Sequence, residues 1–245
     1  MKTVVDQFRR RAGTYSGSAN WIGDKALIRA HIDACGPRHG YLIEVCCGTG
    51  VIGRNLAAAG WRVCGVDLTR EMAREANRHF PCICAPAEDI PFLDAAFDAA
   101  VLRQAYFLLE DGQKALAEIG RVLRPGGAFV LSQTVPYSAE DAPWLEKVHR
   151  AKQAQLRTFH TEETLADELE RGHFRIAGVK RLSVRENITR WMEAAPELSE
   201  EKRAEVCGFV SGAPEAYRRV HNVEIVGGEI FEDWNWVIFS AEKKK

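Results

Sequence analysis

Apolar residues early in the chain form two short runs joined by a helical pattern. Residues 41–46 and 61–66 are each short enough for a buried strand, and apolar side chains recur at helical spacing over residues 51–59. Gly48 and Gly50 stand between the first run and the helix, where the missing side chains let a ligand lie against the backbone. The pattern predicts strand, glycine turn, helix and strand in that order.

Asp67 closes the second of these strands. In such a unit the first turn of the helix offers unpaired N–H groups, and a carboxylate at the end of the second strand can accept hydrogens from two ribose hydroxyls. The stretch therefore predicts a binding site for a nucleoside.

Strands and helices continue to alternate beyond Asp67. The pattern predicts a helix over residues 68–80, a third strand from Cys82 and a fourth strand over residues 97–102. An amphipathic helix, a proline-glycine turn and a fifth strand follow over residues 112–133. This order is typical of an α/β fold with a doubly wound, mostly parallel sheet, helices on both faces and a small cap.

The remaining segments are predicted from weaker patterns. We expect one domain over residues 1–245, with parts assigned as follows: an N-terminal helical arm (1–40), a cofactor-binding core (41–135), a helical cap with an insertion at 187–222 (142–222), and closing strands (223–245). Within these parts the sequence predicts helices over 142–157 and 161–171, a strand over 174–184, a hairpin turn at Gly227-Gly228 and a last strand over 236–241.

The composition of the chain argues against several classes of function. With 33 basic and 34 acidic residues the formal net charge is -1, which gives no electrostatic footprint for nucleic acid and favours a small-molecule partner. The start of the chain lacks a signal-peptide core, and no later run approaches a membrane span. The seven cysteines form no C-x-x-C pair, which favours reduced thiols in the cytoplasm.

The glycine turn carries a more specific signal. It has the order Glu44-x-Cys46-x-Gly48-x-Gly50 rather than the three glycines that admit a dinucleotide pyrophosphate. The acid suits a cationic group, such as an amino group, better than a pyrophosphate. The turn resembles the first motif of class I S-adenosylmethionine-dependent methyltransferases, acid-x-G-x-G-x-G. Cys46 replaces the usual first glycine, and because cysteine is small we expect a slightly tighter turn and retained binding.

Further stretches resemble the same family in order. "CICAPAEDIPF" is similar to the stretch that holds the adenine, which implies contact with the backbone N–H of Ala87. Pro86 stands where the family usually has an aspartate, so the acceptor role passes to Glu88 or Asp89, with Glu88 favoured. "RVLRPGG" is similar to the signature before the fifth strand, and the aromatic N-terminal segment is similar to that of ubiquinone and menaquinone C-methyltransferases.

The resemblance implies a seven-stranded Rossmann-like sheet and S-adenosyl-L-methionine as cofactor. Leu68, next to Asp67, is assigned to the cofactor site with it. Ligands of such sheets bind beyond the carboxyl ends of the strands near the switch in strand order, which places Arg103 beside the methionine part of the cofactor. Metal-dependent relatives have acids after strands four and five, but here Arg103-Gln104 and Gln133-Thr134 follow those strands, so we expect no catalytic metal.

The methyl group of a sulfonium is already activated, so positioning is expected to supply most of the rate. If a general base is needed, histidines are the first candidates because their pKa lies near neutral pH. His160 is ranked first, and Tyr15 and Tyr106 are the phenolic alternatives; the other histidines near the expected site are His149, His173 and His221.

The N-terminal arm and the cap are expected to cover the site and select the substrate. They supply aromatic side chains that suit a planar or apolar molecule: Phe8, Tyr15, Trp21, Trp144, Phe159 and Trp191. Two alternatives remain at this stage. The chain could bind the cofactor without catalysis, as a sensor or a partner subunit. It could also be a nicotinamide-dependent oxidoreductase, which the absent third glycine disfavours.

Overall fold

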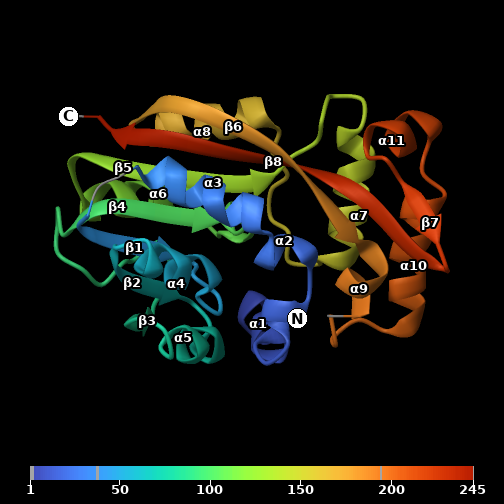
Figure 1. Cartoon of the computed structure of the whole chain (residues 1–245), viewed down its shortest axis with the longest axis horizontal. Helices are drawn as coiled ribbons and strands as arrows, with labels where there is room; N and C mark the ends of the chain where they lie inside the picture. Colours follow the sequence, from blue (N-terminus) through green and yellow to red (C-terminus); the bar gives the residue numbers. More distant parts are fainter. Residues whose placement is uncertain (1–2, 37–38, 194, 245) are drawn as a thin grey trace.

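The computed structural model describes residues 3–36, 39–193 and 195–244. Its centre is one sheet in the order β3-β2-β1-β4-β5-β8-β6, with short β7 paired to β8 (Figure 1). The strands are β1 (Tyr41–Val45), β2 (Arg62–Asp67), β3 (Cys82–Cys84), β4 (Phe97–Arg103), β5 (Leu123–Thr134), β6 (Phe174–Asn187), β7 (Glu224–Val226) and β8 (Glu229–Lys243). The first five are parallel and β8 is antiparallel to both neighbours, which confirms the predicted α/β fold.

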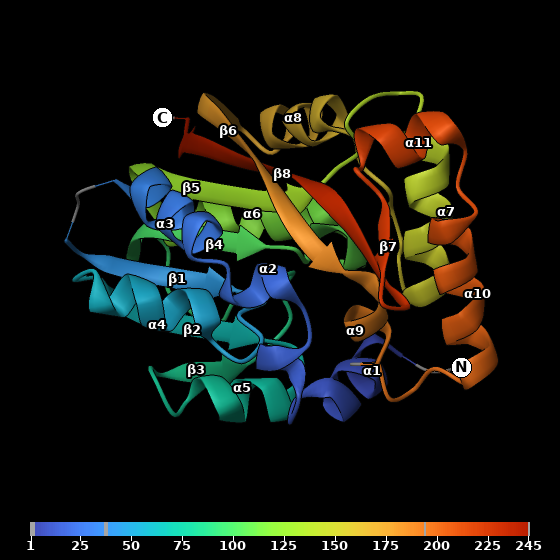
Figure 2. The same cartoon turned by 45° about the vertical axis from the view of Figure 1, so that its right-hand side comes forward.

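Helices cover both faces of this sheet and one of its ends (Figures 1 and 2). They are α1 (Val4–Arg11), α2 (Asn20–Gly23), α3 (Lys25–Cys35), α4 (Val51–Ala58), α5 (Arg70–Ala76), α6 (Gly112–Val122), α7 (Ala142–Lys152), α8 (Glu162–Arg171), α9 (Ile188–Glu193), α10 (Glu200–Ser211) and α11 (Glu215–Val220). None of the helices in the described ranges is long and apolar enough to cross a membrane.

Strand alternation divides the core into two layers. On β1, Leu42 faces the layer of α3 and α4, while its neighbour Ile43 faces the layer of α6 and α8. Val101 and Leu102 on β4 divide in the same way. Because both faces are covered, the central strands are apolar on both sides, which explains the continuous apolar runs in the sequence.

Several predicted boundaries are wrong in length. β8 begins at Glu229 rather than at residue 236, and β6 continues to Asn187, so the two strands pair from Phe174↔Lys243 to Asn187↔Phe231. The Gly227-Gly228 hairpin is confirmed, with φ angles of 59° and 87°. The first part of β8 was missed because it contains polar residues such as Glu232, which interrupt the apolar pattern. The Glu232 side chain is nevertheless buried, and it accepts a hydrogen bond from Tyr217.

The range 142–222, predicted as a cap, is divided between two places. Helices α7, α9 and α10 contact one another at the end of the sheet, and α11 follows them (Figure 2). Helix α8 instead packs on α6 and β6, so it belongs to the sheet layers. The predicted helix over 142–157 ends at Lys152.

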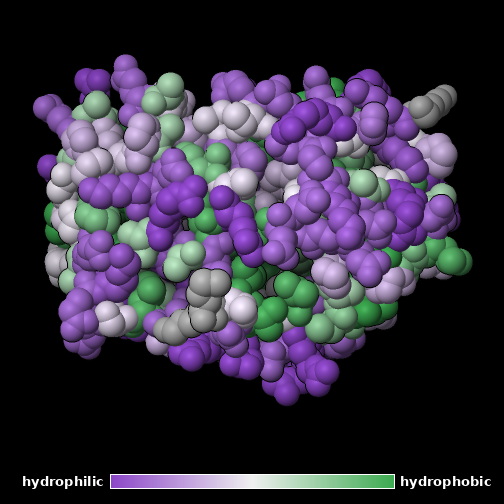
Figure 3. Space-filling view, turned by 180° about the vertical axis from the view of Figure 1, so that it is seen from behind, coloured by the Kyte–Doolittle hydropathy of each residue, from purple (hydrophilic) through white to green (hydrophobic). Residues whose placement is uncertain are grey.

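The predicted N-terminal arm is also divided. Helix α3 packs on the sheet, whereas α1 lies apart from it and begins with a capping box between Thr3 and Asp6. Arg11 at the end of α1 forms a buried ion pair with Glu197, with 2.9 Å between Nε and Oε1. Figure 3 shows the face opposite to Figure 1, where hydrophilic residues cover the upper part and hydrophobic residues gather in the lower middle.

Candidate active site

The turn after β1 uses a left-handed backbone three times. Cys46, Gly48 and Gly50 have φ angles of 55°, 55° and 78°. This conformation is free of strain for glycine but costs other residues about 1–3 kcal/mol. The conformation at Cys46 gives a physical reason why glycine is usual at that position, and cysteine is held there by the surrounding structure.

Asp67 ties the end of β2 to this turn. Its Oδ2 accepts the N–H of Gly48 at 2.8 Å, and its Oδ1 accepts the N–H of Thr69 at 2.8 Å. Burial raises the pKa of Asp67 to about 6, although these backbone hydrogen bonds oppose the shift. Each carboxylate oxygen can accept more than one hydrogen, so both keep capacity for a ligand hydroxyl.

Glu44 lies beneath the turn rather than in its opening. The side chain is 4% exposed, and Oε2 accepts the N–H of Gly53 at 2.8 Å, which satisfies one donor in the first turn of α4. Burial raises the pKa of Glu44 to about 8, against the opposing charge of Arg103. In this position Glu44 supports the turn, and its predicted contact with an amino group stays a prediction.

A crevice of about 500 Å³ opens at the carboxyl ends of β1, β2 and β4. Its lining includes seven of the nine residues predicted to bind the cofactor: Cys46, Gly48, Asp67, Leu68, Ala87, Glu88 and Arg103. Glu44 and Gly50 do not line it. Residues of α1, among them Val4 and Phe8, form part of the opposite wall. We call this space the crevice.

The outer end of the crevice contains the predicted adenine residues. Ala87 is buried at its wall, and Glu88 accepts the N–H of Glu110 at 3.0 Å through Oε1. Glu88 therefore bridges the loop after β3 to the loop before α6.

At the end of β4, Arg103 and Gln104 face the crevice. The guanidinium carbon of Arg103 lies 4.9 Å from the ring centre of Trp21, and its Nη1 is buried with no partner among the described residues. Burial lowers the pKa of Arg103 to about 10. Gln104 has a φ of 53° and exchanges two hydrogen bonds with Thr134, at 2.7 and 2.8 Å. Two neighbouring strand ends thus carry left-handed residues at the crevice, which no sequence pattern revealed for Gln104.

Tyr15 lies at the inner end of the crevice. Its ring contacts Phe8 and Trp21 edge to face, with centroid distances of 6.1 and 6.4 Å. A side chain at Gly48 would meet this ring at 3.6 Å. Burial raises the pKa of Tyr15, so the phenol is neutral at physiological pH. The structure places Tyr15 at the crevice, and its predicted role as a general base stays a prediction, because a raised pKa disfavours the phenolate form that would accept a proton.

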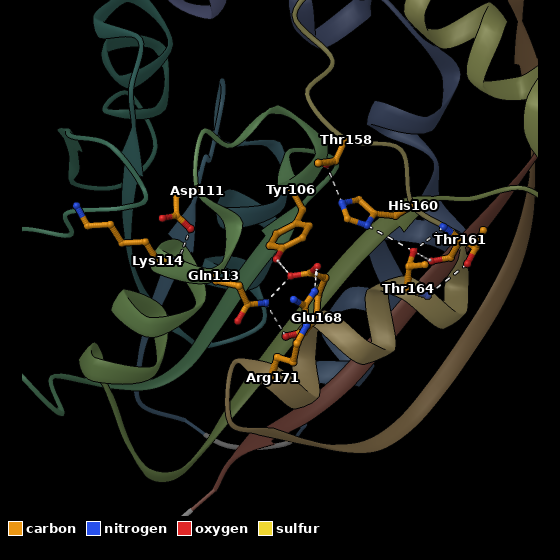
Figure 4. Close-up of polar contacts among 10 residues, drawn as sticks. All are labelled: Tyr106, Asp111, Gln113, Lys114, Thr158, His160, Thr161, Thr164, Glu168 and Arg171. Carbon is orange, nitrogen blue, oxygen red and sulfur yellow. Dashed lines mark hydrogen bonds and ion pairs between the residues drawn. The ribbon is translucent and has the colours of Figure 1, made fainter.

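His160 is not brought to the crevice. It lines a separate surface pocket with Glu168 and Arg171, and its Nε2 lies 2.8 Å from Oγ1 of Thr158 (Figure 4). Tyr106 points toward Glu168 in the same view and donates to its Oε2 at 2.8 Å. The ranking from the sequence assigned a role without the geometry, and the structure shows that the FHT segment turns away from the crevice toward α8.

The other three candidate histidines lie at different places in the fold. His221 is buried and bonded to Asp141 at 2.9 Å between Nε2 and Oδ2, and His173 lies in the turn between α8 and β6. His149 lines an inner cavity of about 50 Å³, together with Trp21, Lys152, Trp191 and other residues. This space, which we call the chamber, shares Phe8, Tyr15, Gln104 and Leu108 with the crevice.

Sequence analysis missed Lys152 and Trp234, which both line the chamber. Lys152 was missed because it ends a helix whose polar residues predict a face exposed to solvent. Trp234 was missed because the last strand was predicted to begin only at residue 236. Trp191 was among the aromatic residues expected near the substrate, and Trp144 and Phe159 are not in the lining of the chamber or the crevice.

The fold defines a doubly wound α/β protein, and its crevice lies at the switch in strand order between β1 and β4, where ligands of such sheets bind. Residues 43–131 match the family model described as a methyltransferase domain. The chain therefore contains a methyltransferase domain, and the resemblance to class I S-adenosylmethionine-dependent methyltransferases is confirmed.

Relatives and solved structures agree with this assignment. A malonyl-[acyl-carrier protein] O-methyltransferase of Pseudescherichia vulneris is 30% identical over 173 residues, which cover 68% of this chain and 65% of the relative. A demethylmenaquinone methyltransferase of Beutenbergia cavernae is 32% identical over 125 residues, 49% of this chain and 52% of the relative. The chain thus spans less than two thirds of either relative.

Two solved structures show the fold. One, from Bacillus halodurans C-125 and assigned as a methyltransferase, has a TM-score of 0.81 and 17% identity, with 90% of this chain and 100% of that chain covered. A geranyl diphosphate methyltransferase in complex with S-adenosylmethionine has a TM-score of 0.61 and 17% identity, with coverage of 89% and 84%.

Proposed function

We propose that this chain binds S-adenosyl-L-methionine in the crevice and transfers its methyl group to a small-molecule acceptor, without a catalytic metal. One observation carries the proposal: residues predicted from separate motifs, at the ends of β1, β2 and β4 and after β3, line a single crevice. The names of the two relatives and the solved complex support the same activity.

The residues present fit the cofactor. Asp67 offers two carboxylate oxygens for the ribose hydroxyls, and the absence of side chains at Gly48 leaves room beside Tyr15. The unpaired Nη1 of Arg103 suits the carboxylate of the methionine part. Ala87 and Glu88 line the crevice, which supports our proposal that they contact the adenine. When bound, the cofactor supplies a methyl group activated by the sulfonium.

The chain contributes position and the exclusion of water. Helix α1 closes one wall of the crevice, and Tyr15 and Gln104 lie where the crevice meets the chamber. An acceptor in the chamber would therefore approach the cofactor through the junction beside Tyr15 and Gln104. We retain Tyr15 as the proposed catalytic residue. His160, held in another pocket, would need a rearrangement to take part.

Metal independence is supported by the kinds of residue at the strand ends. Arg103, Gln104, Gln133 and Thr134 stand where metal-dependent relatives have acids. In the ranges that the structure covers, no group of three or more His, Cys, Asp or Glu could hold a metal ion. All seven cysteines are free, which supports our proposal that the protein works in the reducing cytoplasm.

The test has two stages. Calorimetry with S-adenosylmethionine should show saturable binding, and incubation with candidate acids, phenols and amines should release S-adenosylhomocysteine with at least one of them. A chelator should leave that release unchanged. Absence of binding contradicts the proposal, whereas binding with no release across the acceptor panel favours the sensor alternative.

A further inference from the structure

We propose that the chamber binds an anionic oxygen group of the methyl acceptor, a carboxylate or a phenolate, and that Lys152 is the residue that selects it. This inference rests on the proposed function, because it places the acceptor beside the crevice. It assigns the substrate an anionic oxygen group and disfavours a cationic amine in the chamber.

Lys152 provides the main support for an anionic ligand in the chamber. Its side chain projects from the last turn of α7 and the residue is 5% exposed. Its Nζ lies 3.6 Å from the ring centre of Trp191, and it makes no ion pair with any carboxylate of the described residues. A buried ammonium with only an aromatic face as partner keeps three donors for a ligand.

The carboxylates that act on Lys152 are engaged elsewhere. Glu197 is paired with Arg11, and Glu186 accepts backbone N–H groups from Asn20, Trp21 and Asn187 at 2.9, 3.2 and 3.1 Å. Burial, and after it the charge of Arg11, lower the pKa of Lys152, while the charges of Glu197 and Glu186 oppose the shift. A bound oxygen anion would stabilise the protonated form of Lys152.

Two more polar groups in the chamber are unsatisfied. The Nε1 of Trp21 and the Nε2 of His149 are buried without a partner among the described residues, and each residue is 6% exposed. Indole N–H can only donate, so its partner must be an acceptor atom. Burial lowers the pKa of His149 to about 3, so this ring is neutral and can also donate through one nitrogen.

The size and shape of the chamber limit the chemical group that can enter it. A volume of about 50 Å³ is room for a small group rather than a large ring system. The rings of Trp191 and Trp234 meet edge to face at 4.9 Å and form flat apolar walls. The acidic end of a planar acceptor fits this space, while the rest of the molecule extends past Phe8 and Leu108 into the crevice, where the methyl group is delivered.

The test uses three probes of nearly equal size: benzoate, benzamide and benzylamine. Calorimetry is done on the full chain loaded with S-adenosylhomocysteine, after cofactor binding has been measured for every variant. We expect benzoate to bind best and benzylamine worst. Lys152→Met should weaken benzoate by about 10- to 100-fold and benzamide by less than about threefold, in line with the strength of charged hydrogen bonds.

Lys147→Met is the matched control. Lys147 lies on the same helix and also packs over aromatic rings, those of Trp144 and Phe209, but it does not line the chamber. It should leave benzoate binding unchanged. Trp21→Phe keeps an aromatic ring, though a smaller one, and removes the indole donor, so it should weaken benzoate by about 2- to 10-fold. It tests the inference if Lys152→Met does not fold.

The outcomes separate the two proposals. If the wild-type protein fails to bind the cofactor, the proposed function is wrong. If the cofactor binds but benzoate does not, if benzylamine binds as well as benzoate, or if Lys152→Met keeps the wild-type affinity for benzoate, only the inference about the chamber is wrong.

Discussion

The floor and the roof of the crevice are built in different ways. The floor, residues 44–50 and 67–69, consists of one glycine turn and one strand end joined through backbone N–H groups to Asp67. The roof, formed by α1 and the side chains of the chamber, comes from segments far apart in the sequence, held by contacts such as Arg11 with Glu197.

This difference explains what each part can do. Left-handed φ angles and close backbone approach restrict the floor to a few residue types, so its sequence is diagnostic of the ligand. The roof is held by side-chain packing and ion pairs, which many sequences can supply. The floor therefore suits the cofactor that a family shares, and the roof suits an acceptor that differs between members.

The largest expected effect concerns the attachment of the roof. Arg11→Leu removes one half of the buried ion pair with Glu197, so the free energy of unfolding should fall by about 3–5 kcal/mol. Urea unfolding measures this. Arg9→Leu is the control, because the Arg9 side chain is 52% exposed and should change stability by less than about 1 kcal/mol. Equal effects of the two substitutions would mean that the roof is not held at Arg11.

The second effect concerns the floor. Asp67→Ala removes the acceptor of two backbone N–H groups and of the proposed ribose contacts, so cofactor binding should weaken by about 2–4 kcal/mol. Asp94→Ala, at an exposed ion pair with Arg121, is the control. Calorimetry that finds wild-type affinity in Asp67→Ala would remove Asp67 from the cofactor site.

A third prediction concerns the acid beneath the floor. The pKa of Glu44 rises from 4.5 to about 8 on folding, so its contribution to stability is complete below pH of about 4.5 and is lost as the pH rises through about 8. Between pH of about 6 and 7.5 this lowers the free energy of unfolding by about 2 kcal/mol.

Glu44→Gln cannot ionise and can keep the hydrogen bond to Gly53, so that decline should disappear. Urea unfolding of the cofactor-free protein at both pH values measures it, with Glu75→Gln, at a surface ion pair, as control. A variant with the same pH dependence as wild type would show that Glu44 is ionised throughout.

The smallest effect separates the hydroxyl of Tyr15 from its ring. The ring packs on Phe8 and Trp21, and the hydroxyl has no hydrogen bond to a described residue. Tyr15→Phe should leave cofactor affinity within about threefold and reduce turnover by about tenfold, or about 1.4 kcal/mol. Unchanged turnover, measured by release of S-adenosylhomocysteine, would limit Tyr15 to packing.

The sequence was sufficient for the floor and for most of the sheet. The turn at Gly48 and Gly50, the end of β2 at Asp67 and the extent of β4 follow from local rules, because apolar runs and glycine positions determine them directly. The hairpin at Gly227-Gly228 follows for the same reason.

The roof could not be predicted in the same way. His149 and Lys152 become neighbours of Trp234 only through packing of α7 on the far end of β8, which no local pattern encodes. The position of His160 outside the crevice could not be foreseen, because a segment that follows α7 could turn to either side. β8 was made too short because Glu232 and Asn235 interrupt the apolar pattern although both are buried.

The long pairing of β6 with β8 limits the ways in which the acceptor can enter the site and the product can leave it. These two strands pair from the sheet to the helices at its end, with one register shift between Ile176 and Gly178, so α9 is joined to the sheet by a backbone ladder. A hinge there would have to break strand hydrogen bonds. Helix α1 has no such ladder in the part of the chain that the structure covers and is held by side chains alone. We therefore expect the acceptor to reach the chamber, and the product to leave it, by displacement of α1 while the rest of the molecule stays in place.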